Sequence, residues 1–341
     1  MKQFSEYSFM DYVHHLRLLS IYYLAMATAV FRKVVSALSS MNWFPDLVTP
    51  SDRAVSAYFR YCGLSPCTVD LDDQTVMHFW VPKHRRFDKP SLVMVHGYGG
   101  NAPWQFCTMI GPLSRSFDVY VPDLVFFGKS FSKRSDRTDV FQARCIGEGL
   151  TRMGLKRFSV FGISYGGFVA YRIADLYQEE VEKVVLLSSA VCRTVDQVKE
   201  ELQKLGRDPI EVLVPSQPDS LRFLFNRSMH RTWKGIPDFL LRNYINVIYK
   251  DYRKERMELV EYLLADADPL PVLNQETLII WGDQDRVFPP YFASQLQSHL
   301  GAKSKVEIIK DVGHAANMES PDQLNNLIKS FVSAGSSKHN A

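Results

Sequence analysis

Apolar residues in this chain fall into short runs, and segments with helical spacing separate these runs. A mostly apolar run is typical of a strand that is buried on both faces of a parallel sheet. The runs predict strands over residues 92–95, 118–121, 158–161, 184–188, 277–281 and 306–309. Amphipathic spacing predicts helices over residues 102–113, 141–153, 168–174, 291–300 and 323–332. This alternation indicates an α/β fold whose mostly parallel, doubly wound sheet carries helices on both faces.

Two regions depart from this alternation. Residues 68–71 and 75–81 are expected to form an antiparallel ribbon at one edge of the sheet. Residues 191–270 show helical spacing and many large side chains, so we expect a helical cap over the strand ends, with its aromatic residues mainly in its own core. The chain is therefore divided into an N-terminal segment, a first part of the core, the cap and a second part of the core, over residues 1–50, 51–190, 191–270 and 271–341.

Residues 18–31 form an uncharged stretch near the N-terminus, with basic residues on both sides. As a helix, these 14 residues would extend about 21 Å, which is short of the roughly 30 Å hydrocarbon core of a bilayer. Three interpretations are open: a helix packed on the domain, an interfacial membrane helix, and a signal or anchor segment. Pro45 and Pro50 then predict a linker.

Composition and charge limit the classes of partner. The 40 lysine and arginine residues exceed the 37 acidic residues by three, and this small excess does not indicate a nucleic-acid partner. The five cysteines are dispersed, which favours reduced thiols, and Cys62 and Cys67 lack the second ligand pair of a zinc site. We expect no metal, nucleotide or flavin cofactor. We expect an intracellular protein that is cytoplasmic or, through its N-terminal segment, peripherally associated with a membrane such as the endoplasmic reticulum.

The most specific motif is Gly162-Ile163-Ser164-Tyr165-Gly166, which lies between a predicted strand and a predicted helix. The pattern G-x-S-x-G in that context is typical of the sharp turn that presents a nucleophilic serine. A Cβ atom at either flank would collide with backbone, which explains the two glycines. The turn would place the Ser164 hydroxyl near a helix N-terminus, whose partial positive charge favours an oxyanion. The alternative is a tight turn with an incidental serine.

Two further strand ends supply the groups that a nucleophilic serine needs. His314 follows the last predicted strand and is expected to act as the general base. The acid is either Asp283 or Asp285, which both follow the preceding strand, and we favour Asp285. The chain order serine, acid, histidine is typical of one hydrolase architecture. Asp123 is expected instead to brace the loop that holds Gly128.

Acyl transfer also requires N–H donors for the oxyanion. One donor is expected to be the backbone N–H of Tyr165, directly after the serine, and the other that of Tyr98, in the loop after strand 92–95. Glycines on both sides of Tyr98 would let this loop turn beneath the substrate carbonyl. His96 is expected to be structural rather than a base.

The motifs HGYGG, PDLVFFGKS, GISYGG, WGDQDRVFP and VGHAANMESP, taken in this order, resemble the motif set of the α/β-hydrolase superfamily. The resemblance extends from Leu92 to the end of the chain, with the cap where that superfamily carries its lid. Plant esterases and monoacylglycerol-lipase-like members are the most similar branch. The resemblance implies a catalytic triad of Ser164, Asp285 and His314, with Tyr98 and Tyr165 as oxyanion donors.

These observations favour a serine hydrolase that acts on a small-molecule ester through an acyl-enzyme. An apolar cap and the uncharged N-terminal stretch favour a lipophilic ester such as a monoacylglycerol. A C–C bond hydrolase of diketone-type substrates would use the same three residues. A non-hydrolytic small-molecule receptor on the same fold is a third hypothesis, which ligand-dependent partner binding without turnover would support.

Overall fold

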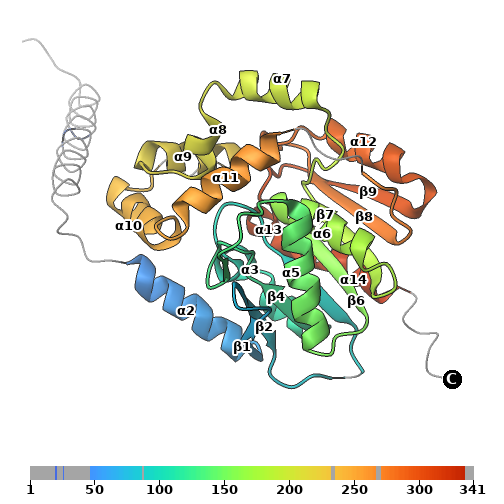
Figure 1. Ribbon diagram of the computed structural model, residues 1–341. Coiled ribbons are helices and arrows are strands. Elements are labelled where there is room, and N and C mark those ends of the chain that lie inside the picture. The colour runs from blue at the N-terminus through green and yellow to red at the C-terminus, as the bar shows by residue number, and fades with distance from the viewer. Residues whose placement is uncertain are drawn as a thin grey trace, which may run out of the picture.

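One mixed sheet runs through the structure, a computed structural model (Figure 1). Its strands are β1 (Leu64–Asp70), β2 (Thr75–Pro82), β3 (Ser91–Val95), β4 (Asp118–Pro122), β5 (Phe131–Ser132), β6 (Phe158–Ile163), β7 (Val181–Leu187), β8 (Glu276–Gly282) and β9 (Ser304–Ile309). They follow the order β1-β2-β4-β3-β6-β7-β8-β9, and β5 pairs with β2 beside this path. All pairs from β4 to β9 are parallel, whereas β2 runs antiparallel to β1, β4 and β5. The predicted parallel sheet with an antiparallel edge ribbon is therefore confirmed.

The structure describes part of the chain, namely Ser20, Met26 and residues 47–86, 88–231, 235–265 and 270–334. Apart from Ser20 and Met26, the uncharged stretch 18–31 lies outside the described residues, so the prediction of membrane contact stays a prediction. Among the helices that the structure describes, none combines the length and the apolar character that crossing a membrane requires. All five cysteines are described, and none forms a disulfide.

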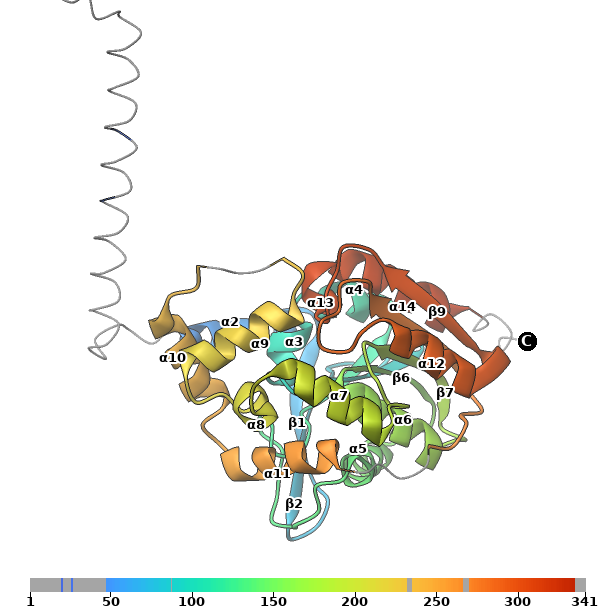
Figure 2. The ribbon, with the colours of Figure 1, turned by 90° about the horizontal axis from the view of Figure 1, so that it is seen from above.

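Helices cover both faces of the sheet because strand side chains alternate between the faces. Val93 and Val95 belong to a core with the helices on one face, whereas Leu92 and Met94 belong to a core with the helices on the other. The first face carries α5 (Asp139–Arg152), α6 (Tyr165–Leu176) and α12 (Tyr291–Leu300). The second face carries α2 (Val48–Tyr61), α3 (Ala102–Phe106), α4 (Ile110–Ser114), α13 (Ala316–Glu319) and α14 (Pro321–Ser333). Figure 2 shows α4 and α14 on the opposite side of β6 from α5.

The structure describes five helices between β7 and β8, and in Figure 1 they occupy the top and the upper left of the view. They are α7 (Val195–Leu205), α8 (Pro209–Leu213), α9 (Pro218–Ser228), α10 (Asp238–Ile248) and α11 (Arg253–Leu264). We call α7–α11 the cap. Its own core contains Leu221, Leu224 and Tyr249, with Phe223, Phe225 and Tyr244 packed against it. Most described aromatic side chains of the cap therefore serve its core, as expected, while the limits assigned to the cap stay a prediction.

Two predictions about helices are wrong. The expected linker around Pro50 is the start of α2, because a proline in the first helical turn needs no N–H partner. The single helix expected over residues 102–113 is divided into α3 and α4. In a continuous helix the Pro112 ring would clash with the Thr108 carbonyl, so the chain turns between them.

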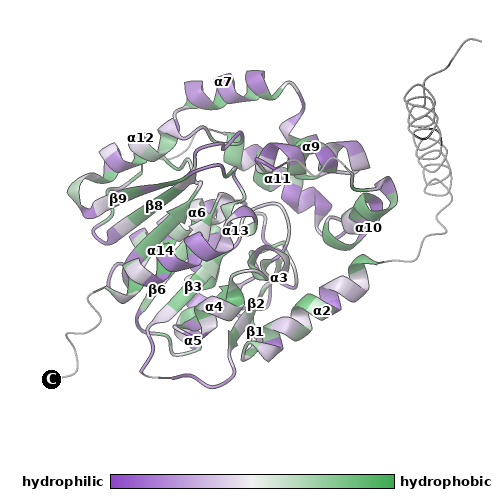
Figure 3. Cartoon of the chain, turned by 180° about the vertical axis from the view of Figure 1, so that it is seen from behind, coloured by the Kyte–Doolittle hydropathy of each residue, from purple (hydrophilic) through white to green (hydrophobic). Residues whose placement is uncertain are grey.

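The hydrophobic residues concentrate on the central strands, as Figure 3 shows, whereas hydrophilic residues are prominent on α7 and α9. Every residue of β3, β4 and β6 is buried. The buried strands form a rigid support, and the loops at their carboxyl ends hold the residues that the sequence predicts for the site.

Candidate active site

Ser164 occupies a strained turn between β6 and α6. Its φ angle is 53°, a value that residues with a side chain rarely adopt. A Cβ at Gly162 would lie 2.3 Å from the Gly166 carbonyl oxygen, and one at Gly166 would lie 2.3 Å from the carbonyl oxygens of Val95 and His96. Only glycine fits at either flank, so the predicted strand–turn–helix geometry is confirmed.

His314 joins Ser164 to Asp285. Its Nε2 atom lies 2.8 Å from Ser164 Oγ, and its Nδ1 atom lies 2.8 Å from Asp285 Oδ2. A carboxylate only accepts hydrogen bonds, so Nδ1 carries the proton and donates a hydrogen bond to Asp285. Nε2 is then free to accept a hydrogen bond from the Ser164 hydroxyl. This arrangement can take the proton of Ser164 when the oxygen attacks an electrophile.

The Asp285 carboxylate is held on both oxygens. Its Oδ1 accepts hydrogen bonds from the backbone N–H groups of Val287 (2.8 Å) and Phe288 (2.9 Å), and Oδ2 faces His314. Asp285 is only 5% exposed, so these donors replace the water that a carboxylate would otherwise bind. Asp283 accepts a long hydrogen bond (3.4 Å) from the backbone of Val312. The structure therefore brings Asp285, the favoured candidate, against the histidine.

The loop after β3 lies beside the serine. Gln105 fixes this loop, because its side-chain amide exchanges two 2.8 Å hydrogen bonds with the backbone of Gly97. The ring of Tyr98 packs against that of Tyr165 at a centroid distance of 5.9 Å, and its hydroxyl donates to the carbonyl of Arg256 in the cap. Within the described part of the chain, the backbone N–H groups of Tyr98 and Tyr165 have no hydrogen-bond acceptor. Two donors are thus free near the serine.

His96 and Asp123 have structural roles, as expected. His96 Nδ1 donates to the carbonyl of Gly97 (2.8 Å), and Nε2 accepts from the backbone N–H of Leu124 (3.0 Å). Burial lowers the pKa of His96, so the ring is neutral. Asp123 accepts from the backbone N–H of Lys129 (3.2 Å) and lies 2.9 Å from Nδ1 of His78. No motif in the sequence indicates the His78 contact, because it depends on the pairing of β2 with β4.

A cavity of about 120 Å³ opens at Ser164 between the sheet and the cap. Ser164, Tyr98 and Tyr165 line it from the core side. Its wall is mainly apolar and includes Phe168, Val198, Leu202, Leu205, Val212, Leu213, Leu224, Leu263, Leu264, Val287, Phe288 and Phe292. Two cationic side chains, Arg193 and Arg227, also line it, and no motif in the sequence pointed to them.

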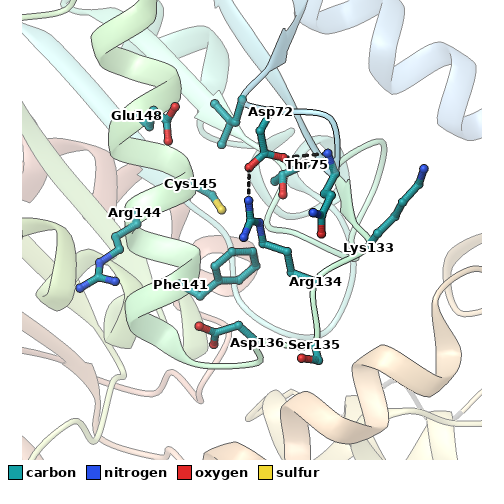
Figure 4. A pocket seen from close by; sticks show the side chains of 12 residues that line it. Asp72, Thr75, Lys133, Arg134, Ser135, Asp136, Phe141, Arg144, Cys145 and Glu148 are labelled. Atoms are coloured by element: carbon teal, nitrogen blue, oxygen red, sulfur yellow. Dashed lines mark hydrogen bonds and ion pairs between the residues drawn. The ribbon is translucent and has the colours of Figure 1, made fainter.

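A second hollow of about 690 Å³ lies between α5, the β1–β2 turn and the segment after β5 (Figure 4). Acidic and basic side chains line it together, and Arg134 Nη2 lies 2.6 Å from Asp72 Oδ2. Burial raises the pKa of the Cys145 thiol there to about 12, which makes it a poor nucleophile. None of the site residues predicted from the sequence lines this hollow.

Comparison with known proteins supports the same fold. Residues 92–327 match the sequence profile described as "Alpha/beta hydrolase family". A crystal structure of a membrane phospholipase A superposes with a TM-score of 0.68 at 22% identity, covering 94% of this chain and 98% of that one. At this identity the superposition shows similarity of fold.

Two curated relatives differ in the reaction that their names give. Human monoacylglycerol lipase ABHD6 is 27% identical over 264 residues, which are 72% of this chain and 76% of the relative. A 2-hydroxy-6-oxononadienedioate/2-hydroxy-6-oxononatrienedioate hydrolase from Pseudomonas sp. is 27% identical over 259 residues, which are 71% of this chain and 87% of the relative.

Proposed function

The chain belongs to the alpha/beta hydrolase family, and from this membership we propose that it is a serine hydrolase that cleaves carboxylic esters. The observation that carries the proposal is the hydrogen-bonded series from Ser164 through His314 to Asp285, with 2.8 Å at each step. A serine hydroxyl is a weak nucleophile by itself, and a neutral imidazole that is oriented by a carboxylate activates it.

The reaction proceeds in two halves. Ser164 Oγ bonds to the acyl carbon while His314 Nε2 takes the hydroxyl proton, and Asp285 stabilises the resulting imidazolium. The backbone N–H groups of Tyr98 and Tyr165 donate to the oxyanion of the tetrahedral intermediate. His314 then gives its proton to the leaving alcohol, which departs and leaves an acyl-enzyme. A water molecule then loses a proton to His314 as its oxygen attacks the same carbon, and His314 returns that proton to Ser164 Oγ as the bond to Ser164 breaks and the acid leaves.

The acyl group that we propose is lipophilic. The apolar cavity wall supports this assignment, and so does the relative named as a monoacylglycerol lipase. A cavity of about 150 Å³ accommodates benzene. The cavity of about 120 Å³ therefore holds a short acyl group, and a long chain requires displacement of cap side chains. A monoacylglycerol-like substrate lies at membranes, so peripheral membrane association through residues 18–31 is part of the proposal.

C–C bond hydrolysis is the second candidate, and the relative from Pseudomonas sp. is the observation that favours it. The two candidates share Ser164, His314 and Asp285 and differ in the leaving group, an alkoxide in one and a stabilised carbanion in the other. Substrate preference therefore separates them, whereas the effect of mutating Ser164 does not.

The test combines labelling of the nucleophile with a substrate series. Wild type and Ser164→Ala are treated with a fluorophosphonate probe and assayed with p-nitrophenyl esters from acetyl to long acyl chains and with a diketone-type substrate. We expect labelling and ester turnover by the wild type, and neither by the variant. Turnover of the diketone alone would support the second candidate. A wild type that neither labels nor turns over any substrate would contradict both hydrolase assignments and favour a receptor.

A further inference from the structure

Three arginines lie at or near the boundary between the core and the cap. Arg193 follows β7, Arg227 lies on α9 and Arg256 lies on α11. A cation that is removed from water is costly unless other groups compensate its charge. The three guanidinium groups differ in this compensation, and the difference singles out one of them.

Arg256 is compensated by the protein. Its Nε donates to the carbonyl of Phe126 (2.8 Å) and its Nη1 to that of Ile248 (2.5 Å), and the ring of Phe127 lies 4.5 Å from the guanidinium carbon. Arg256 does not line the cavity at Ser164. Arg256 therefore links α11 to the backbone of the core and of α10 and has a structural role.

Arg227 lines the cavity, and carboxylates partly offset its charge. Burial lowers the pKa of Arg227, and the negative charges of Glu201 and Asp285 counteract part of this shift. Glu201 lines the same cavity and also lies 3.4 Å from Nζ of Lys204 on its own helix. Arg227 therefore already lies in a negative field.

Arg193 lines the cavity without such compensation. Its Nη2 donates to the carbonyl of Leu263 (2.5 Å), and its guanidinium carbon lies 5.3 Å from the ring of Phe168 and 5.6 Å from that of Phe288. Burial lowers the pKa of Arg193 to about 10. Among the residues that the structure describes, no carboxylate forms an ion pair with it. Most of its five N–H donors thus remain available.

We propose that Arg193 is an anion-binding residue of the substrate site, and that the preferred ester carries a carboxylate or phosphate at a distance from the scissile bond. This proposal rests on the proposed function, since it uses the cavity at Ser164. Phe168 and Phe288 lie against the guanidinium from within the same cavity wall, and the N–H groups that remain can pair with two oxygens of one anion. The substrate is then an acyl compound that combines an apolar part with one anionic group.

The test compares esters that differ only in charge. The first pair is p-nitrophenyl valerate and mono-p-nitrophenyl glutarate, and the second is a monoacylglycerol and the acylglycerol phosphate with the same chain. The kcat/KM of each member is measured for the wild type, Arg193→Met, Arg193→Lys and Arg227→Met. Methionine retains the apolar stem of arginine without its charge, and Arg227→Met is the matched control in the same cavity.

For the wild type we expect the anionic member of at least one pair to be preferred by about tenfold or more, which is typical of charge-assisted hydrogen bonds. Arg193→Met should abolish this preference, because the kcat/KM of the anionic ester falls much further than that of the neutral ester. Arg193→Lys should retain part of the preference, and Arg227→Met should change it less than about threefold. Preference within the first pair identifies a carboxylate, and preference within the second a phosphate.

Two results would overturn the assignment. The first is turnover of neutral esters without any anionic preference, which leaves the proposed function intact. The second is a preference that Arg227→Met removes and Arg193→Met does not. If no ester is turned over, the proposed function fails separately, and thermal stabilisation of Ser164→Ala by glutarate and by glycerol phosphate provides the test. The site is supported if either compound raises the melting temperature of Ser164→Ala and the added substitution Arg193→Met removes this increase. The site is contradicted if neither compound raises the melting temperature of Ser164→Ala. Circular dichroism reports whether each variant folds, and fluorophosphonate labelling adds a second check for the variants that retain Ser164.

Discussion

The carboxyl ends of the parallel strands and the cap present different chemistry to the same cavity. At the carboxyl ends of the strands, polar side chains pair with one another at short distances, as in the contacts of His314 with Ser164 and Asp285. In the cap, the arginines of α11 donate to backbone carbonyls instead, as Arg253 does to Val214 (2.6 Å), and the cavity wall is mainly apolar. The carboxyl ends of the strands hold groups that can move protons, whereas the cap contributes mainly apolar side chains to the cavity wall.

This difference indicates how the two regions divide the function. A change at the carboxyl ends of the strands should alter the rate of the chemical step and leave substrate choice intact. A change in the cap or at its boundary should alter which ester reacts, or how well it is positioned. Two substitutions test this division, and a third tests how the stability of the carboxyl end of β3 depends on pH.

The largest expected effect follows Asp285→Asn. The amide would offer an N–H group to the Nδ1 atom of His314 and favour the wrong tautomer, so kcat should fall about 10⁴-fold. Asp283→Asn is the matched control in the same loop, because Asp283 has only a 3.4 Å contact with the backbone of Val312. Steady-state ester hydrolysis measures both. A larger loss for Asp283→Asn would contradict the assignment of the acid.

An intermediate effect should follow Arg256→Met, which removes the links from α11 to the carbonyls of Phe126 and Ile248. The hydroxyl of Tyr98 bonds to the carbonyl of Arg256, so a displaced α11 would also displace the proposed oxyanion donor. We expect kcat and the labelling rate to fall about tenfold to a hundredfold, with KM nearly unchanged.

Arg253→Met provides the control for this change. Arg253 donates to the carbonyls of Val214 and Pro215, so its links remain within the cap. It should lower the melting temperature by a similar amount and change kcat less than about threefold. Equal losses of kcat in both variants would show that Arg256 contributes only stability.

The smallest effect concerns His96, which is buried at the carboxyl end of β3. Its pKa in the folded protein is lowered by burial, with Asp123 acting against this shift and Arg256 adding to it. As the pH falls below about 6.5, the unfolded chain binds a proton before the folded one does, so stability is present above this pH and is lost on acidification.

His96→Gln should reduce this loss of stability. The free energy of unfolding, measured with urea at several pH values, should fall less steeply for the variant, by at most about 1.4 kcal/mol per pH unit. Identical slopes for wild type and variant would show that His96 does not contribute to the acid sensitivity.

Local patterns predicted the parts of this molecule that depend on local physics. The apolar runs become β3, β6, β7 and β8 because a central parallel strand must be apolar on both faces. The glycines around Ser164 mark the turn because the backbone itself leaves no room for Cβ atoms. Elements and candidate residues of the site could therefore be predicted from the sequence.

Features that depend on distant contacts could not be predicted in this way. The sequence favoured Asp285 over Asp283, but only the structure shows which carboxylate faces His314 across two loops. Arg193 belongs to no motif, and only the structure shows that no carboxylate among the described residues forms an ion pair with it. The division of the helix over residues 102–113 depends on Pro112, a local signal that hydrophobic spacing alone does not include.

The distance along the chain between the nucleophile and its base has a consequence for biosynthesis. Ser164 and His314 are 150 residues apart, and the whole cap and β8 lie between them. At a translation rate of about 5–20 residues per second, His314 leaves the ribosome roughly 8–30 s after Ser164. A nascent chain can thus fold the serine turn well before it acquires a base. The proposed hydrolysis therefore cannot begin before the 150 residues that separate Ser164 from His314 have been synthesised.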